Sequence, residues 1–312
     1  MGLISLIAAL LLEQWRPLAE QRHLFSQVTR YAEFLERQFN AGEAQQGMVA
    51  WFVAVLPPVL LAWILHALLL YWSPAPFGAL LALAFNVLAL YLTMGFRQFS
   101  HFFTAIHLAL KQDDLVRARE LLGAWRGHDC SDLSREEVAR LAIEDALAAS
   151  HRHVFAVVFW FVLLPGPSGA MLYRLATFLG RRWGAPNNAE LAQFGRFSRQ
   201  AFDLLDWLPV RFTATAFAIV GDFEDAIFCW RTQAARWSDS ALGIVLAAGA
   251  GAIGVRLGNP VVMHGTVVER PELGLGEEAD SGFFDSTIGL VWRALVLWLL
   301  MLLLLGIARA VS

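Results

Sequence analysis

The stretch MVAWFVAVLPPVLLAWILHALLLYW, residues 48–72, decides the fold class of this chain. It contains no Asp, Glu, Lys or Arg, and it exceeds the roughly 20 apolar residues that a helix needs to cross a bilayer. A second apolar stretch, residues 76–96, follows after a short connection. A third, residues 287–309, is interrupted only by Arg293 near its start, where a long side chain can reach the membrane surface. The sequence therefore predicts three membrane-spanning helices, the first two joined as a tight hairpin.

The composition also indicates a membrane protein and excludes several classes of function. The chain is 57% hydrophobic and 16% charged, whereas soluble domains are about 45–50% apolar and about 25% charged. Lys111 is the only lysine and no GxxxxGK[ST] motif occurs, which excludes a P-loop ATPase. The net charge is −3 and no module combines aromatic with basic residues, so we expect no nucleic-acid partner.

The apolar N-terminal run MGLISLIAALLL has no preceding basic residue and is followed by Glu13, which is unfavourable for a cleaved signal peptide. It is also too short to span a bilayer. We interpret it as a retained half-membrane helix or an interfacial anchor, with a signal sequence as the alternative.

A fourth apolar segment, residues 154–183, is broken by PGPSG at 165–169. Helix breakers at membrane depth are tolerated where the backbone lines a protein-buried cavity, and short half-helices are typical of binding sites. The segment predicts a re-entrant or broken helix, with a kinked span as the alternative. Residues 207–230 and 241–255 are further, marginal apolar segments, and the second is rich in Ala and Gly, as close helix packing in a bilayer requires.

The polar region 97–153 is rich in arginine, whereas the connection at 73–75 carries no charge. By the positive-inside rule this region is cytoplasmic, and so is the segment before the first span. Its apolar residues recur at helical spacing, and SREE at 134–137 is a capping box that opens another helix. The predicted fold is an all-α, polytopic helical integral membrane protein, residues 1–312 forming a single membrane domain with 97–153 as a cytoplasmic helical insertion.

The residues usually associated with chemistry form no strong motif. The histidines match no zinc pattern, so packing or solvated histidines are expected. In HDC at 128–130, adjacent residues of a turn are not expected to point at one another, and both Cys130 and Cys229 are expected to be reduced bystanders. Glu144 and Asp145 precede an apolar segment, where a carboxylate either serves as base or metal ligand or simply lies on a solvated helix face.

Polar residues within apolar surroundings carry more information, because burying them without partners costs several kcal/mol. These residues are Tyr173, Arg174, Asp206, Arg211, Asp222, Glu224, Asp225, Arg256 and Arg270. Structural pairing, for example of Asp206 with an arginine, is the simplest explanation. Binding of a ligand is the alternative.

The stretch GVRLGNPVVMHGTVVERPELG, residues 254–274, lies between two apolar runs and contains Arg256, Gly258, His264, Arg270 and Gly274. Glycines let backbone N–H groups approach a ligand, and arginine forks bind carboxylate or phosphate in a bidentate manner. Such a loop can close over an anionic, partly apolar ligand at the membrane interface. It can equally be a plain connector, and composition does not separate the two.

The order of these motifs resembles the CobD/CbiB family of cobalamin-biosynthesis membrane proteins and its relative AmpE, from about residue 97 to the end. The resemblance lies in the helical stretch 101–148, in FWFVLLPGPSGAMLYR, in FDLLDWLPVRFTA and in the Gly-rich stretch 254–274. The matching positions are Glu144, Tyr173, Arg174, Asp206, Arg211, Arg256, Gly258, Arg270 and Gly274.

The resemblance implies an enzyme of the bacterial inner membrane that makes adenosylcobinamide phosphate by joining a corrinoid carboxylate to an aminopropanol-type amine. On this hypothesis Glu144 is the catalytic base or metal ligand, and Arg256 and Arg270 hold the anionic end of the corrinoid-like ligand. Mg²⁺ and ATP are implied by the resemblance only, and membrane lipid is the other expected partner.

Two departures from the synthase pattern support a second hypothesis. The chain begins with LLLEQWRPLAEQRHLF in place of a Gly-Asp-Pro motif, and DALAASHRHVFA follows Glu144 in place of Glu-Asn and Asp-Gly. The alternative is therefore an AmpE-like sensor or regulatory membrane protein that kept the fold and binds a ligand without turnover. Whether the chain is an enzyme is left open by its sequence.

Overall fold

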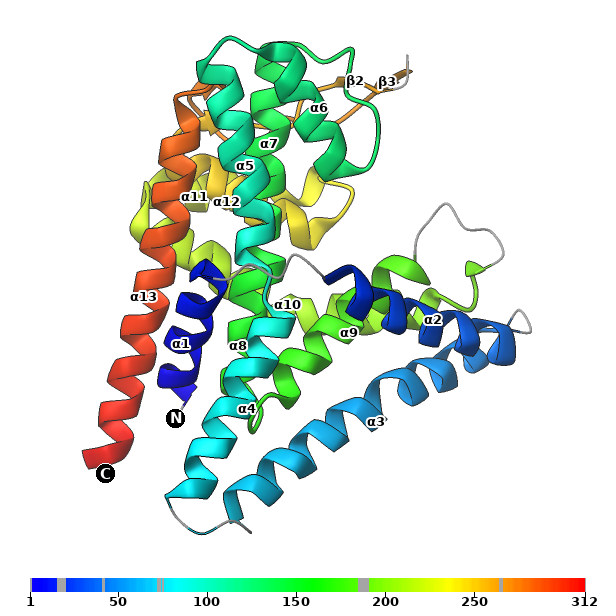
Figure 1. Ribbon diagram of the computed structural model, residues 1–312. Helices are drawn as coiled ribbons and strands as arrows, with labels where there is room; N and C mark the ends of the chain where they lie inside the picture. The colour runs from blue at the N-terminus through cyan, green and yellow to red at the C-terminus, as the bar shows by residue number, and fades with distance from the viewer. Residues whose placement is uncertain are drawn as a thin grey trace. The chain divides into compact units, whose positions relative to one another are not determined.

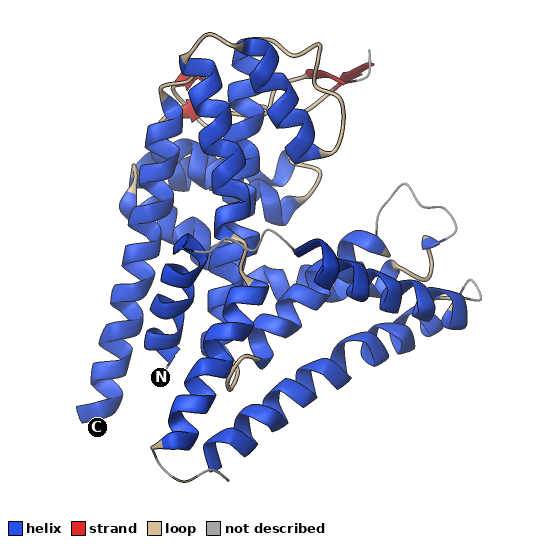
Figure 2. Ribbon diagram, in the orientation of Figure 1, coloured by secondary structure: helices blue, strands red, loops and turns tan. Residues whose placement is uncertain are grey.

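The computed structural model describes residues 2–15, 21–40, 43–71, 74, 76–184, 191–263 and 266–311. Most of this part of the chain is helical (Figure 1, Figure 2). The chain divides into two compact units, unit 1 with Met1–Gly95 and Ala156–Leu208, and unit 2 with Phe96–Phe155 and Pro209–Ser312. The segment of unit 2 that ends at Phe155 nearly coincides with the polar region 97–153.

Unit 1 is built from helices of very different lengths. These are α1 (Gly2–Trp15), α2 (Gln21–Phe39), α3 (Ala44–Tyr71), α4 (Phe77–Thr93), α8 (Ala156–Leu163), α9 (Ser168–Arg182) and the first part of α10 (Arg196–Val220). Helix α3 packs against α2, α4 and α9, and α1 packs against α4. Their core includes the fully buried rings of Trp183 and Phe194 together with Leu35 and Trp51.

In the described part of the chain, three helices are long and apolar enough to cross a membrane: Ala44–Tyr71, Arg135–Leu163 and Phe283–Ala308. The first and third are the spans predicted at 48–72 and 287–309. The predicted span 76–96 is the shorter apolar helix α4, of 17 residues. The second long helix was not predicted, because its polar first half and apolar second half read as separate segments. The predicted class, an all-α polytopic membrane protein, is confirmed.

The helix break predicted at PGPSG is present. Helix α8 ends at Leu163 and α9 begins at Ser168, and the two helices pack against each other. Gly166 in the turn has φ +63, a left-handed conformation that glycine adopts without a steric penalty. A Cβ on Gly169 would lie 1.9 Å from the carbonyl oxygen of Trp160, so α8 and α9 approach each other at backbone distance here.

The hydroxyl of Tyr31 in α2 replaces a hydrogen-bond donor that Pro57 removes from α3. Pro57 lies inside α3 and has no N–H, so the carbonyl of Val53, four residues earlier, loses its helical donor. The Tyr31 hydroxyl donates to this carbonyl at 3.0 Å. The contact ties α2 to the first turns of α3.

Unit 2 surrounds helix α7 (Arg135–Ser150), which continues through a π-helical turn, η1 (His151–Phe155), into α8. The predicted capping box of Ser134 and Glu137 is formed at its start. Around it lie α5 (Phe96–Lys111), α6 (Leu115–Arg126), the rest of α10 from Pro209, α11 (Phe223–Gln233), η3 (Ala234–Arg236), α12 (Ser240–Ile253) and α13 (Phe283–Val311). Helix α7 packs against α5, α6, α12 and α13, and most of its side chains are buried.

The Ala/Gly-rich helix α12 packs as its composition predicted. A Cβ on Gly251 would lie 2.5 Å from the carbonyl oxygen of Asp225 in α11, and one on Gly249 would lie 2.9 Å from the side chain of Leu147 in α7. Larger residues at either position would separate these helices.

Short strands that the sequence did not predict organise the Gly-rich stretch after α12. Strand β1 (Val255–Arg256) pairs in parallel with β4 (Glu277–Glu278), and β2 (Val261–Met263) forms an antiparallel hairpin with β3 (Thr266–Val268). A further bridge joins Leu257 to Leu273. The stretch is therefore an ordered, folded-back loop of unit 2.

Candidate functional site

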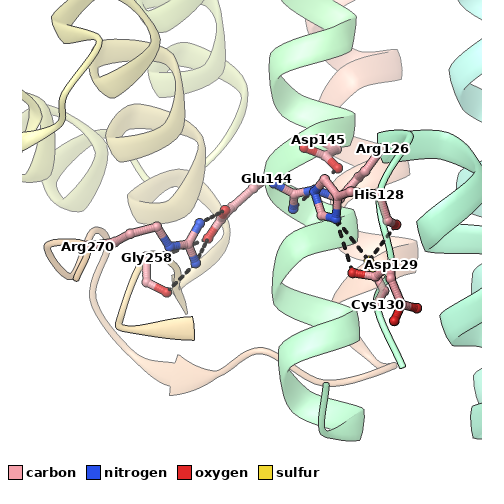
Figure 3. A network of polar contacts seen from close by, with 8 residues as sticks. All are labelled: Arg126, His128, Asp129, Cys130, Glu144, Asp145, Gly258 and Arg270. Carbon is pink, nitrogen blue, oxygen red and sulfur yellow. Dashed lines mark hydrogen bonds and ion pairs between the residues drawn. The ribbon is translucent and has the colours of Figure 1, made fainter. Parts of the chain in front are cut away.

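The Glu144 side chain lies at the centre of a polar cluster in unit 2 (Figure 3). Glu144 belongs to helix α7 and is only 4% exposed. Its Oε1 accepts the backbone N–H of Gly258 at 2.8 Å, and its Oε2 accepts Nη1 of Arg270 at 2.7 Å. A buried carboxylate is stable only when it is paired and hydrogen-bonded, and both conditions are met here.

The Arg270 side chain is fixed by several hydrogen bonds and by a contact with an aromatic ring. Besides contacting Glu144, its Nη2 donates to the carbonyl of Gly258 at 3.0 Å, and its Nε donates to the carbonyl of Asn259 at 3.2 Å. The guanidinium also lies 5.5 Å from the centre of the Trp237 ring. Arg270 therefore links the later part of the loop both to its earlier part, at Gly258 and Asn259, and to helix α7, at Glu144.

Two glycines make this geometry possible. Gly258 has φ +76, and a Cβ there would lie 2.0 Å from the carbonyl oxygen of Pro271. Gly274 has φ +89, and its N–H donates to Oε1 of Gln233 at 2.6 Å while its carbonyl accepts from Nε2 of the same side chain at 3.1 Å. Only glycine fits either position without displacing backbone.

Two further arginines lie in this part of unit 2. Arg140, one helical turn before Glu144, donates from Nη2 to the carbonyl of Pro260 at 3.3 Å, and its buried Nε has no hydrogen-bond partner among the described residues. Arg256 on β1 lies 3.7 Å from Glu278, its pairing partner on β4, and the described part of the chain offers no partner to its buried Nε either. Within the described residues, two guanidinium groups at this loop thus retain an unused donor.

The described residues contain no group of three or more His, Cys, Asp or Glu side chains that could hold a metal ion. Both oxygens of Glu144 are already engaged by protein donors. An ion such as Mg²⁺, which commonly binds one or two carboxylates together with substrate phosphates, would have to take most of its ligands from substrate and water. The residues present do not fit a protein-built metal centre.

A second pair of candidate residues meets in unit 1. The Tyr173 hydroxyl donates to Oδ1 of Asp206 at 2.8 Å, and both side chains are buried. Arg174 follows on α9 and is half-buried. Arg211 is also half-buried and lies beyond Pro209, in the part of α10 that belongs to unit 2. His264 lies outside the described residues.

The structure corrects the interpretation of HDC at 128–130. His128 and Cys130 do point at each other, with Nδ1 and Sγ 3.7 Å apart, and Arg126 donates from Nε to Nε2 of His128 at 3.2 Å. The Cys130 thiol is buried, however, and burial raises its pKa above the ordinary value. The thiolate required of a nucleophile is therefore disfavoured, and the turn has a structural role.

Sequence reasoning missed Gln233, Trp237 and Arg140 as parts of the cluster. Gln233 and Trp237 lie at the end of α11 and beyond η3, and nothing in their local sequence marks them as partners of Gly274 or Arg270. Arg140 had a signal, because a residue four positions before Glu144 shares its helix face.

The fold and this cluster define a class: a helical membrane protein with a buried carboxylate latched to an arginine of a Gly-rich loop. The model of the family described as CobD/Cbib protein matches residues 6–291. The chain is 38% identical to the cobalamin biosynthesis protein CobD of Stutzerimonas stutzeri (strain A1501), an alignment that covers 97% of each protein. It is 37% identical to the protein of the same name from Chromobacterium violaceum, over 81% of this chain and 77% of that relative. The chain belongs to the CobD/CbiB family of cobalamin-biosynthesis proteins. No solved structure matches it.

Proposed function

We propose that this protein binds a corrinoid carboxylate and joins it to an aminopropanol-type amine as an amide, in the bacterial inner membrane. Family membership and the curated name of the relatives support a role in cobalamin biosynthesis. The contact between Glu144 and Arg270 supports the carboxylate chemistry.

Arg270 already holds a carboxylate. The Glu144 oxygens accept Nη1 at 2.7 Å and Nη2 at 3.4 Å, the forked geometry that guanidinium groups form with carboxylates in general. A substrate carboxylate offers the same two oxygens, so it can replace Glu144 on Arg270. The unused Nε donors of Arg140 and Arg256 add positive charge where the anionic end of a corrinoid would lie.

When a substrate carboxylate replaces Glu144 on Arg270, Glu144 becomes available as a general base. Released from Arg270, the carboxylate accepts a proton from the ammonium form of the amine and leaves a nucleophilic nitrogen. A C–N bond then forms at the substrate carboxyl carbon while one C–O bond breaks. ATP, where bound, would activate that carboxyl oxygen, which would then leave on phosphate instead of as water.

The topology proposed with this function places several helices across the membrane and residues 97–153 in the cytoplasm. Three helices of sufficient length and apolarity support a multi-pass protein. The arginines of 97–153 favour the cytoplasmic side. Reporter fusions after Tyr71 and after Arg126 test this arrangement, because the two should read opposite sides.

Ligand binding without turnover, as in an AmpE-like regulatory protein, is the second candidate. It is favoured by the engagement of both Glu144 oxygens and by the apolar sequence ALAA that follows Asp145 where the synthases carry further polar residues. This candidate predicts that a corrinoid binds and that no amide forms.

A product assay separates the two. Purified protein in lipid nanodiscs is incubated with a corrinoid bearing a free carboxylate, the amine, ATP and Mg²⁺, and the amide is detected by mass spectrometry. The proposal predicts product from the unaltered protein and at least a hundredfold less from Glu144→Gln, in line with loss of a general base. Corrinoid binding without product in the unaltered protein would favour the regulatory candidate, and absence of both would reject the corrinoid proposal.

A further inference from the structure

The two acidic residues on α2, Glu33 and Glu36, turn toward α9. Glu36 accepts Nε of Arg182 and the indole N–H of Trp183, each at 2.6 Å, and Glu33 lies 3.4 Å from Nη2 of Arg182. Both carboxylates therefore share the Arg182 guanidinium within unit 1.

The exposed face of α2 next to Glu33 is basic and aromatic. Arg30, Phe34 and Arg37 follow one another at helical spacing and are exposed, and Gln27 extends the stripe by one turn. Phe34 is 57% exposed. Interfacial helices carry Lys and Arg on a polar face and Trp, Phe or Leu on the face that enters the membrane, so an exposed phenylalanine beside arginines fits the border between the two faces.

The depth of α2 fits such a position. Tyr31 bonds to Val53 of α3, and Val53 lies only five residues after Met48, where the apolar part of α3 begins. Five residues correspond to about 7.5 Å of helix. Interfacial helices bury their apolar face about 5–10 Å below the headgroup boundary. Within unit 1, α2 also runs at a steep angle to α4 (Figure 1).

We propose that the stripe Gln27–Arg30–Phe34–Arg37 binds anionic phospholipid headgroups, with Arg30 and Arg37 on the phosphates and the Phe34 ring at the acyl boundary. Charge complementarity favours this occupant, because Arg182 pairs with both acids of α2 while Arg30 and Arg37 are exposed. The start of the candidate span α3, against which α2 packs, also exposes apolar side chains, among them Phe52 and Val49. Helix α2 then fixes α3 and α9 at the level of the membrane surface.

Site-directed spin labelling tests this in the full chain. A nitroxide is placed by Phe34→Cys in nanodiscs of phosphatidylcholine alone or with phosphatidylglycerol, and collision with oxygen is compared with collision with a water-soluble nickel chelate. Leu60→Cys on α3 supplies the bilayer reference and Glu120→Cys on α6 the aqueous one, both at exposed positions. Gln27→Cys is a second reporter that keeps the native Phe34. Cys130 and Cys229 are buried, and their background is measured in the protein without an added cysteine.

The expected oxygen-to-nickel ratio at residues 34 and 27 lies between those of the two references. Adding Arg30→Gln and Arg37→Gln shifts it toward the aqueous value only in the anionic membrane, with membrane partitioning weakened about fivefold per arginine. Arg117→Gln, which removes one positive charge from α6, leaves it unchanged. An aqueous ratio at both reporters in both membranes would overturn the proposal in favour of water or a soluble partner. An unchanged ratio in the double arginine variant would overturn headgroup recognition.

Discussion

Arg270 and Glu144, 126 residues apart in the sequence, form a buried pair at 2.7 Å that closes the Gly-rich loop onto α7. The Arg270 side chain is 13% exposed and that of Glu144 is 5% exposed. One of the contacts that hold the loop is therefore an ion pair whose carboxylate half resembles the chemical group of the proposed substrate.

Removing one partner of this pair should lower the free energy of unfolding more than removing both. Arg270→Ala leaves a buried, unpaired carboxylate and should destabilise unit 2 by about 3–5 kcal/mol. The double variant Glu144→Gln/Arg270→Met removes both charges and should recover much of that loss. Thermal unfolding in detergent measures both, and equal melting temperatures for the single and double variants would contradict the pairing.

Gly258→Ala should open the loop. The added Cβ would meet the Pro271 carbonyl at 2.0 Å, in addition to the strain of φ +76. Gly127→Ala is the matched control, because its φ is +77 and nothing lies within 4 Å of the new Cβ. The control should lose only about 1–2 kcal/mol. Faster proteolysis within 255–278 in Gly258→Ala, but not in Gly127→Ala, is the expected result; similar rates would show that backbone strain alone is at work.

Tyr31→Phe should destabilise unit 1 by about 1 kcal/mol, because the Val53 carbonyl loses the hydroxyl that replaces the donor removed by Pro57. In a Pro57→Ala background the helix can supply that N–H itself. The cost of Tyr31→Phe should then shrink toward zero in a double-mutant cycle of melting temperatures. A cost that is unchanged by Pro57→Ala would rule out this compensation.

Cys130 should react slowly with alkylating reagents at neutral pH. Burial raises its thiol pKa, so the folded state keeps the thiol protonated to higher pH than the unfolded chain does. The rate should increase as pH rises toward the elevated pKa, and unfolding should accelerate it at any fixed pH. Rapid modification of the folded protein at pH 7 would contradict this, with Cys130→Ser identifying the site.

The sequence predicted those features that depend on local periodicity and composition. The long spans at 48–72 and 287–309, the break at PGPSG and the capping box at Ser134 each follow from neighbouring residues, and the structure shows all of them. The helix Arg135–Leu163 was missed because the charges of its first half hide its continuity.

The candidate site was predicted as residues but not as contacts. Glu144, Gly258 and Arg270 were named from the sequence, yet their mutual hydrogen bonds depend on how the loop folds back. Gln233 was missed because its contacts are with backbone atoms 41 positions away. Pairing across such separations depends on the tertiary fold, and one sequence carries no local signal for it.

The most direct test of the central claim is corrinoid binding by Glu144→Gln and Arg270→Ala, with a second corrinoid whose carboxylate is blocked as an amide. If substrate carboxylate replaces Glu144 on Arg270, Glu144→Gln frees the arginine and should bind the free carboxylate at least as tightly as the unaltered protein. Arg270→Ala should lose that binding, and the blocked corrinoid should bind weakly to all three. Equal binding of the free and blocked corrinoids, or binding retained in Arg270→Ala, would contradict the exchange.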